Sequence, residues 1–144
     1  MESLWKNCSY GDVTLETYQS ALQTYNIPNL RELVLNGNNI GREGCITISN
    51  LLKKESTVLT EVFLIDTGVN DEGVEIIANS LKHNTTLEKL NLTRNGITEK
   101  GCKAFLKLLV HVSSTIENTY KSNHTLTECI LTRDNNKMQS LINQ

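Results

Sequence analysis

Hydrophobic residues along the chain follow a strand-like spacing first and a helical spacing soon afterwards. Leu33 and Leu35 lie two residues apart, so on a strand their side chains point to the same side. The period then changes, because Cys45, Ile48 and Leu52 follow one another at intervals of three and four residues. The pattern therefore predicts a short strand followed by a helix, each with one apolar side.

The strand and helix pattern occurs several times. Its starts at Leu30, Leu59 and Leu87 are 29 and 28 residues apart, and a fourth start at Leu126 follows after 39 residues. A glycine and two apolar residues recur behind each of the first three starts: Gly44, Ile48, Leu52; Gly73, Ile77, Leu81; Gly101, Phe105, Leu109. A single unit cannot bury its own apolar sides, so we expect neighbouring units to stack with their strands in a parallel sheet.

This repeat resembles the leucine-rich repeat, specifically the ribonuclease-inhibitor-like subtype with units of about 28 residues. The resemblance covers roughly residues 30 to 134. It implies an α/β fold, a curved solenoid forming a short horseshoe arc with a parallel β-sheet on the concave face and helices on the convex face. It also implies that Asn38 and Asn95, with Thr67 in the corresponding place, bond the turn after each strand and help stack successive units.

The repeats divide the chain into parts of one domain, 1–144. We expect a degenerate N-terminal capping unit over 1–29, full repeats over 30–58, 59–86 and 87–125, and a partial C-terminal repeat over 126–144. Within the capping unit, Asp12 to Tyr25 has the pattern of a helix. The third full repeat carries an insertion near 111–122, which is either a short extra helix or a tolerated surface insertion.

Composition and charge narrow the class of protein. Leu, Asn and Thr supply 53 of the 144 residues, as a short repeated pattern would. The formal net charge of −2 argues against nucleic-acid binding, which requires a basic face to neutralise phosphates. The chain has neither the roughly 18 consecutive apolar residues of a membrane span nor a signal-peptide pattern, so we expect a cytoplasmic protein that does not bind membranes.

Residue types with reactive side chains offer no site for catalysis. Cys45 and Cys102 follow the repeat glycine at the same offset, so we expect both in the buried helix face, and Cys129 takes the place of a core leucine. The histidines lie near helix ends or in the insertion: His83, His111, His124. No carboxylate or nucleophilic residue lies near them at a spacing that would indicate a Ser-His-Asp or Cys-His arrangement. We therefore expect no enzyme activity, no metal and no cofactor.

The strand residues that point away from the core are expected to have no structural role, and they are the candidate partner-binding residues. They are Glu32, Val34, Asn36, Glu61, Phe63, Ile65, Lys89, Asn91, Thr93, Glu128 and Ile130, with Arg94 at the end of a strand. Phe63 stands in a mostly apolar central row, and Lys89 interrupts a row of glutamates. An aromatic anchor with a charged rim is typical of protein-binding surfaces, although a short arc of four strands could simply tolerate these residues.

We therefore expect a noncatalytic protein–protein interaction module that binds a protein partner of unknown identity through its concave face. Members of the family that it resembles share a scaffold and differ in their partners. One alternative is a GTPase-activating protein of the Ran type, for which Arg94 or Arg133 would be the contributing side chain. Another is a structural fragment of a longer array, either monomeric or weakly self-associating through its C-terminal edge.

Overall fold

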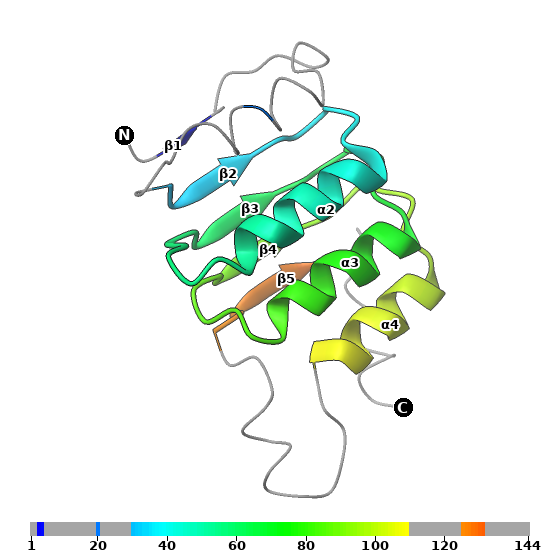
Figure 1. The fold of residues 1–144 in the computed structure, drawn as a ribbon. Coiled ribbons are helices and arrows are strands. Elements are labelled where there is room, and N and C mark those ends of the chain that lie inside the picture. Colours follow the sequence, from blue (N-terminus) through cyan, green and yellow to red (C-terminus); the bar gives the residue numbers. More distant parts are fainter. Residues whose placement is uncertain (1–2, 5–19, 21–29, 110–124, 132–144) are drawn as a thin grey trace, which may run out of the picture.

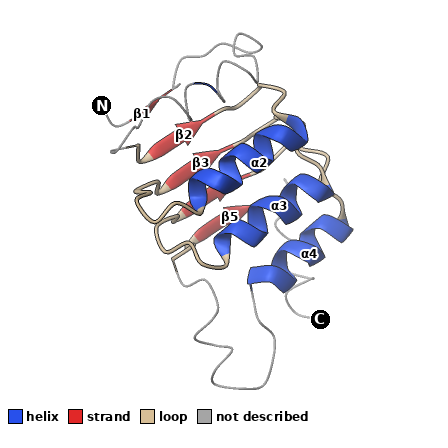
Figure 2. Ribbon diagram, in the orientation of Figure 1, coloured by secondary structure: helices blue, strands red, loops and turns tan. Residues whose placement is uncertain are grey.

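The protein is built from one parallel sheet with helices on one of its faces (Figures 1 and 2). The computed structural model describes residues 3–4, 20, 30–109 and 125–131. The strands are β1 (Ser3–Leu4), β2 (Glu32–Val34), β3 (Glu61–Phe63), β4 (Lys89–Asn91) and β5 (Glu128–Ile130), and the helices are α2 (Gly41–Leu52), α3 (Asp71–Leu81) and α4 (Glu99–Leu109). The strands pair in chain order, so each unit adds one strand to the sheet and the fold is the expected curved solenoid.

The sheet contains one strand more than the four expected from the repeat starts. β1 pairs in parallel with β2, and Leu4 lies opposite Leu33. The two leucines are 29 residues apart, which is the spacing of the later repeats. Lys6 occupies the place of the second strand leucine and so conceals this strand in the hydrophobic pattern.

The core lies between the sheet and the helices, as the two periodicities predict. The central strand position carries one row of core-facing residues in register across β2 to β5: Leu33, Val62 and Leu90, which are buried, and Cys129, which is partly buried against the core. The inward sides of the helices are also buried, including Cys45, Ile48, Leu52, Val74, Ile77, Ala78, Leu81, Cys102 and Phe105. Burial raises the pKa of the Cys45 thiol to about 11, which keeps it protonated and unreactive, in agreement with a core role.

Asn95 fastens the turn after β4 to the preceding unit. Its Oδ1 accepts hydrogen bonds from the backbone N–H groups of Thr67 (2.9 Å) and Val69 (3.1 Å). Its Nδ2 donates to the carbonyl oxygens of Leu64 (2.6 Å) and Leu92 (2.8 Å). One amide thus satisfies buried backbone groups of two units, which confirms the stacking role expected at this position.

The corresponding residues of the other turns carry out part of this role. The Nδ2 of Asn38 donates to the carbonyl oxygen of Leu35 (3.1 Å), and the hydroxyl of Thr67 donates to that of Leu64 (2.9 Å). The Oδ1 of Asn38 is buried and has no partner among the described residues. The positions one repeat before it fall outside that part of the chain. The full inter-unit bridge is therefore seen at Asn95.

Glycine near the start of α3 and of α4 allows each of these helices to approach the preceding one. A Cβ atom on Gly73 would lie 2.8 Å from the Sγ of Cys45, and one on Gly101 would lie 3.1 Å from the Cα of Asp71. At the same seam the carboxylate of Asp71 accepts hydrogen bonds from the N–H and the hydroxyl of Thr98, both 2.7 Å. These bonds lower the pKa of Asp71. The repeat glycine is thus explained by helix packing at Gly73 and Gly101.

Charged residues mark the ends of the helices. Acidic residues lie in each first turn, and Lys107 lies in the last turn of α4, as expected for partners of the helix dipole. Lys53 and Lys82 instead occupy the C-cap positions of α2 and α3. The two earlier helices therefore end one residue before these lysines.

Several expectations fall on residues that the structure does not describe. They include the insertion near 111–122, the end of the partial repeat from 132 onward and almost all of the helix expected from Asp12 to Tyr25. Ser20 is the described residue of that last range, and it is helical and exposed. Among the helices that are described, none is both long and apolar enough to cross a bilayer.

Candidate functional site

The candidate partner-binding residues lie in rows that cross the concave side of the sheet. The strand register places Glu32, Glu61, Lys89 and Glu128 in one row, and Val34, Phe63, Asn91 and Ile130 in the next. Glu128 is exposed and the other seven side chains are half-buried. Residues far apart in the sequence are therefore brought side by side at the strand spacing of about 4.8 Å.

The apolar part of this surface is centred on Phe63. Val34 lies opposite Phe63 on the neighbouring strand, and Ile65 follows two residues later on the same side. On the other side Asn91 stands between Phe63 and Ile130. The expected apolar row is thus interrupted, and Val34, Phe63 and Ile65 form the contiguous patch, which we call the Phe63 patch.

Lys89 is held by the acidic row that it interrupts. Its Nζ lies 2.9 Å from the Oε1 of Glu61, and both side chains are part-exposed. The hydrogen bond and the charge of Glu61, followed by the charge of Glu128, raise the pKa of Lys89. Lys89 is therefore a fixed cation within an acidic row, and Glu128 adds an exposed carboxylate at its far end.

Three polar residues of the concave face have structural roles. The Oδ1 of Asn36 accepts a hydrogen bond from the N–H of Ile65 (2.8 Å) on the next unit. The Oδ1 of Asn91 accepts from both the N–H (3.1 Å) and the hydroxyl (2.9 Å) of Thr93. The expectation that these side chains have no structural role is wrong for Asn36, Asn91 and Thr93. β2 and β4 have only three residues each, so backbone donors beyond their ends need side-chain acceptors.

Arg94 lies at the edge of the concave face in an unusual backbone conformation. Its φ is 60°, and the corresponding residues of the two preceding units are Asp66, with φ of 58°, and Gly37, with φ of 74°. Left-handed φ values suit glycine and are uncommon for arginine. Arg94 is exposed, so its guanidinium is accessible beside the concave rows. Arg133 falls outside the described residues.

Comparison with known proteins agrees with the repeat fold. The family model described as Leucine Rich repeat matches residues 26–49 and 83–106. The chain is 32% identical over 118 residues to Ribonuclease inhibitor of Mus musculus, a match that covers 81% of this chain and 25% of the inhibitor. The chain is a leucine-rich repeat protein of the ribonuclease-inhibitor-like type.

Other similar proteins share the repeat. Leiomodin-3 of Homo sapiens is 33% identical over 85 residues, which are 58% of this chain and 15% of that protein. This leucine-rich repeat chain therefore spans a quarter or less of the length of these curated relatives. A solved structure named Leiomodin-1 Actin-Binding Site 2 aligns with a TM-score of 0.62 at 20% identity, covering 91% of this chain and 89% of that one. At this identity the likeness shows the fold alone.

The site has the features of a binding surface. Repeat solenoids present extended concave surfaces to their partners, and this type of repeat supports a role in protein interaction. In the described ranges, no three or more His, Cys, Asp or Glu side chains come together as possible metal ligands. The arrangement can supply apolar contact at the Phe63 patch, charged contact at the acidic row and a guanidinium at the strand end.

Proposed function

We propose that this leucine-rich repeat protein is a noncatalytic interaction module that binds a protein partner through its concave face. The observation that carries the proposal is the Phe63 patch, where a large aromatic side chain is half-buried on a solvent-facing sheet surface. Aromatic side chains surrounded by polar groups often dominate binding free energy, because they bury much apolar area at little entropic cost. The neighbouring charged row then selects the orientation of the partner.

The concave rows can be separated experimentally from the rest of the surface. Affinity capture from cells that express the protein should recover specific partners with the wild type and lose them with Phe63→Asp. Ile46→Asp is the matched control, because Ile46 is also half-buried but belongs to α2 on the helix side. Circular dichroism should show that both variants remain folded.

The opposite pattern would refute binding through the concave face. If Phe63→Asp captures the same partners as the wild type while Ile46→Asp loses them, the binding surface lies on the helices. Binding of a purified partner, measured by titration calorimetry with both variants, would then place the surface without the complications of a cell extract.

The noncatalytic part of the proposal has its own test. Addition of the purified protein to small GTPases should leave the rate of GTP hydrolysis unchanged. Acceleration by the wild type that disappears in Arg94→Ala would overturn the noncatalytic part and would favour the GTPase-activating alternative.

A further inference from the structure

Three lysines line the outer side of α4. Lys100, Lys103 and Lys107 follow one another at intervals of three and four residues, and all three are exposed. On a helix this spacing places them on one side over about 10 Å of axis. We call these residues the lysine stripe.

The lysine stripe is specific to α4 among the three helices of the layer. The repeat places the same three surface positions on each helix: Glu43, Ile46, Asn50 on α2; Glu72, Glu75, Asn79 on α3; Lys100, Lys103, Lys107 on α4. These positions carry one glutamate on α2, two on α3 and three lysines on α4. The folding pattern does not demand lysine there, because the other two helices form without it.

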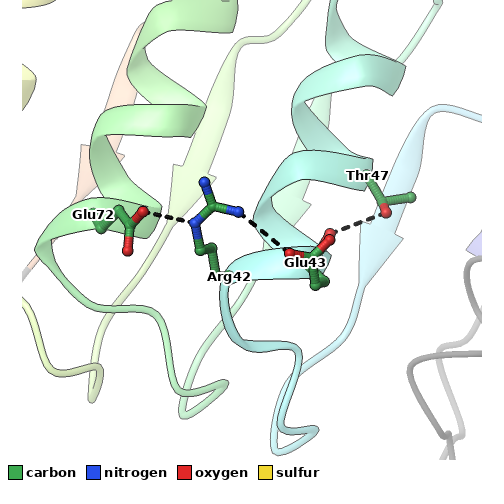
Figure 3. Close-up of polar contacts among 4 residues, drawn as sticks. All are labelled: Arg42, Glu43, Thr47 and Glu72. Carbon is green, nitrogen blue, oxygen red and sulfur yellow. Dashed lines mark hydrogen bonds and ion pairs between the residues drawn. The ribbon is translucent and has the colours of Figure 1, made fainter.

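Ion pairs neutralise much of the charge where α2 meets α3. The side chain of Arg42 on α2 reaches toward α3, with its Nε 2.6 Å from the Oε1 of Glu72 and its Nη1 3.3 Å from that of Glu43 (Figure 3). All three side chains are exposed, so these ion pairs contribute little to stability. Their consequence is local charge balance at this seam.

The lysine stripe keeps most of its positive charge. Lys103 pairs with Glu99 of the same helix at 2.8 Å. Within the described part of the chain, Lys100 and Lys107 form no ion pair. The charge of Lys100 reaches Asp71 of α3, whose pKa it helps to lower after the hydrogen bonds from Thr98 and Gly101. Among the described residues, two of the three ammonium groups thus have no ion-pair partner and can meet an external anion.

The surroundings of the lysine stripe restrict the shape of that anion. Packed helices lie about 8–10 Å apart, so Glu75 on α3 is roughly one helix diameter away, and unlike Glu72 it forms no ion pair among the described residues. A broad polyanion such as duplex DNA, or an anionic membrane surface, would extend over this carboxylate and be repelled. A single polypeptide segment lying along α4 would meet the lysines and avoid it.

We propose that α4 binds an acidic segment of a partner polypeptide along the lysine stripe. A partner helix that runs antiparallel to α4 and carries carboxylates at i, i+4 and i+7 would match the spacing of Lys100, Lys103 and Lys107. The lysine stripe belongs to α4, which lies in the helix layer, whereas Phe63 belongs to β3 in the sheet (Figure 1). The two surfaces can be occupied independently, so this inference does not depend on the function proposed for the concave face.

A designed peptide provides a direct test. The probe is a fluorescently labelled synthetic helical peptide with glutamates at i, i+4 and i+7, and binding is followed by anisotropy at low ionic strength. Lys100→Ala/Lys103→Ala/Lys107→Ala should weaken binding by about tenfold, because three exposed ion pairs together contribute about this factor. The matched control is Glu72→Ala/Glu75→Ala/Asn79→Ala, which changes the same positions on α3 and should bind equally or more tightly.

Further measurements make the inference falsifiable. Alanine favours helices, and unchanged thermal unfolding of both triple variants would show that folding is retained. Three results would each overturn the inference: full affinity in the lysine variant, equal binding of a peptide whose glutamates are distributed around the helix, or tighter binding of duplex DNA or phosphatidylserine vesicles than of the patterned peptide. Loss of affinity as salt rises to about 0.5 M would support it, since screening weakens exposed ion pairs.

Discussion

Adjacent residues of one strand meet opposite demands in this protein. Val62 is fully buried against the helices, whereas Phe63, the next residue, is half-buried on the concave face. The row that contains Val62 is apolar in every described repeat: Leu33, Val62, Leu90, Cys129. The row that contains Phe63 mixes aliphatic, aromatic and amide side chains: Val34, Phe63, Asn91, Ile130. The core dictates one row and leaves the other available for specificity.

The largest expected effect comes from a substitution in the buried row that contains Val62. Val62→Asp would place a carboxylate in the core without a partner, which should reduce the free energy of unfolding by roughly 4 kcal/mol or more. Phe63→Asp should cost about 1 kcal/mol, because its side chain is only half-buried. Urea denaturation of both variants measures the contrast. Similar losses in the two would show that the rows are not distinct.

Substitution of two asparagines should show the same contrast between a side chain that holds the fold together and one on the concave face. Asn95→Ala should cost about 3 kcal/mol, because the N–H groups of Thr67 and Val69 lose their acceptor. Asn91→Ala should cost about 0.5 kcal/mol, because its bonds to Thr93 are local and water can replace them. Chemical denaturation distinguishes these values, and a larger loss for Asn91→Ala would contradict the assigned roles.

The glycines allow a similar comparison between a packed position at a helix seam and an open position. Gly101→Ala should destabilise the protein by about 1 kcal/mol, because overpacking against Asp71 outweighs the better helix propensity of alanine. The control is Gly96→Ala, where the nearest atom to the added Cβ is 3.7 Å away and the change should stay within about 0.5 kcal/mol. Thermal unfolding of the two variants would reveal the difference. A gain of stability in Gly101→Ala would mean that the helices can move apart without cost.

The turn beyond β4 should show a gain rather than a loss. Arg94→Gly removes an arginine from a left-handed conformation, and we expect it to stabilise the protein by about 0.5 kcal/mol. Asp66→Gly should gain less, because aspartate tolerates this conformation better. Melting temperatures report both changes. A destabilised Arg94→Gly variant would show that the arginine side chain makes contacts that stabilise the fold.

The smallest expected effect is a loss of folding stability at low pH that depends on Asp71. Hydrogen bonds from Thr98 lower the pKa of Asp71 in the folded state, so the unfolded chain takes up the proton first as the pH falls. The stability from this contact is present above the unfolded pKa of about 3.9 and is lost as the pH falls through the lower folded value. Urea denaturation between pH 7 and pH 3 should show a shallower acid loss in Asp71→Asn than in the wild type. An equal slope in both would exclude this contribution.

Much of the fold could be read from the hydrophobic pattern, and part of the candidate site could not. The period of two at Leu33 and Leu35 and the helical period at Ile48 and Leu52 correctly identified the buried sides. The same pattern missed β1, because Lys6 interrupts it. The lysine stripe was also missed, since each lysine by itself resembles an ordinary solvated residue. The lysine stripe becomes visible when the equivalent surface positions of the three helices are compared.

The sequence by itself determined the repeat, the stacking of strand on strand and the residues of the core. The spacing of hydrophobic residues shows which side chains lie on the same side of a strand or helix. These features therefore follow from local sequence alone. Only the tertiary structure decided that Asn36 bonds Ile65, that Lys89 pairs with Glu61 and that Arg94 adopts a left-handed turn. The two pairings join atoms of residues 28 or 29 positions apart, and the arginine conformation follows from the turn in which it is placed.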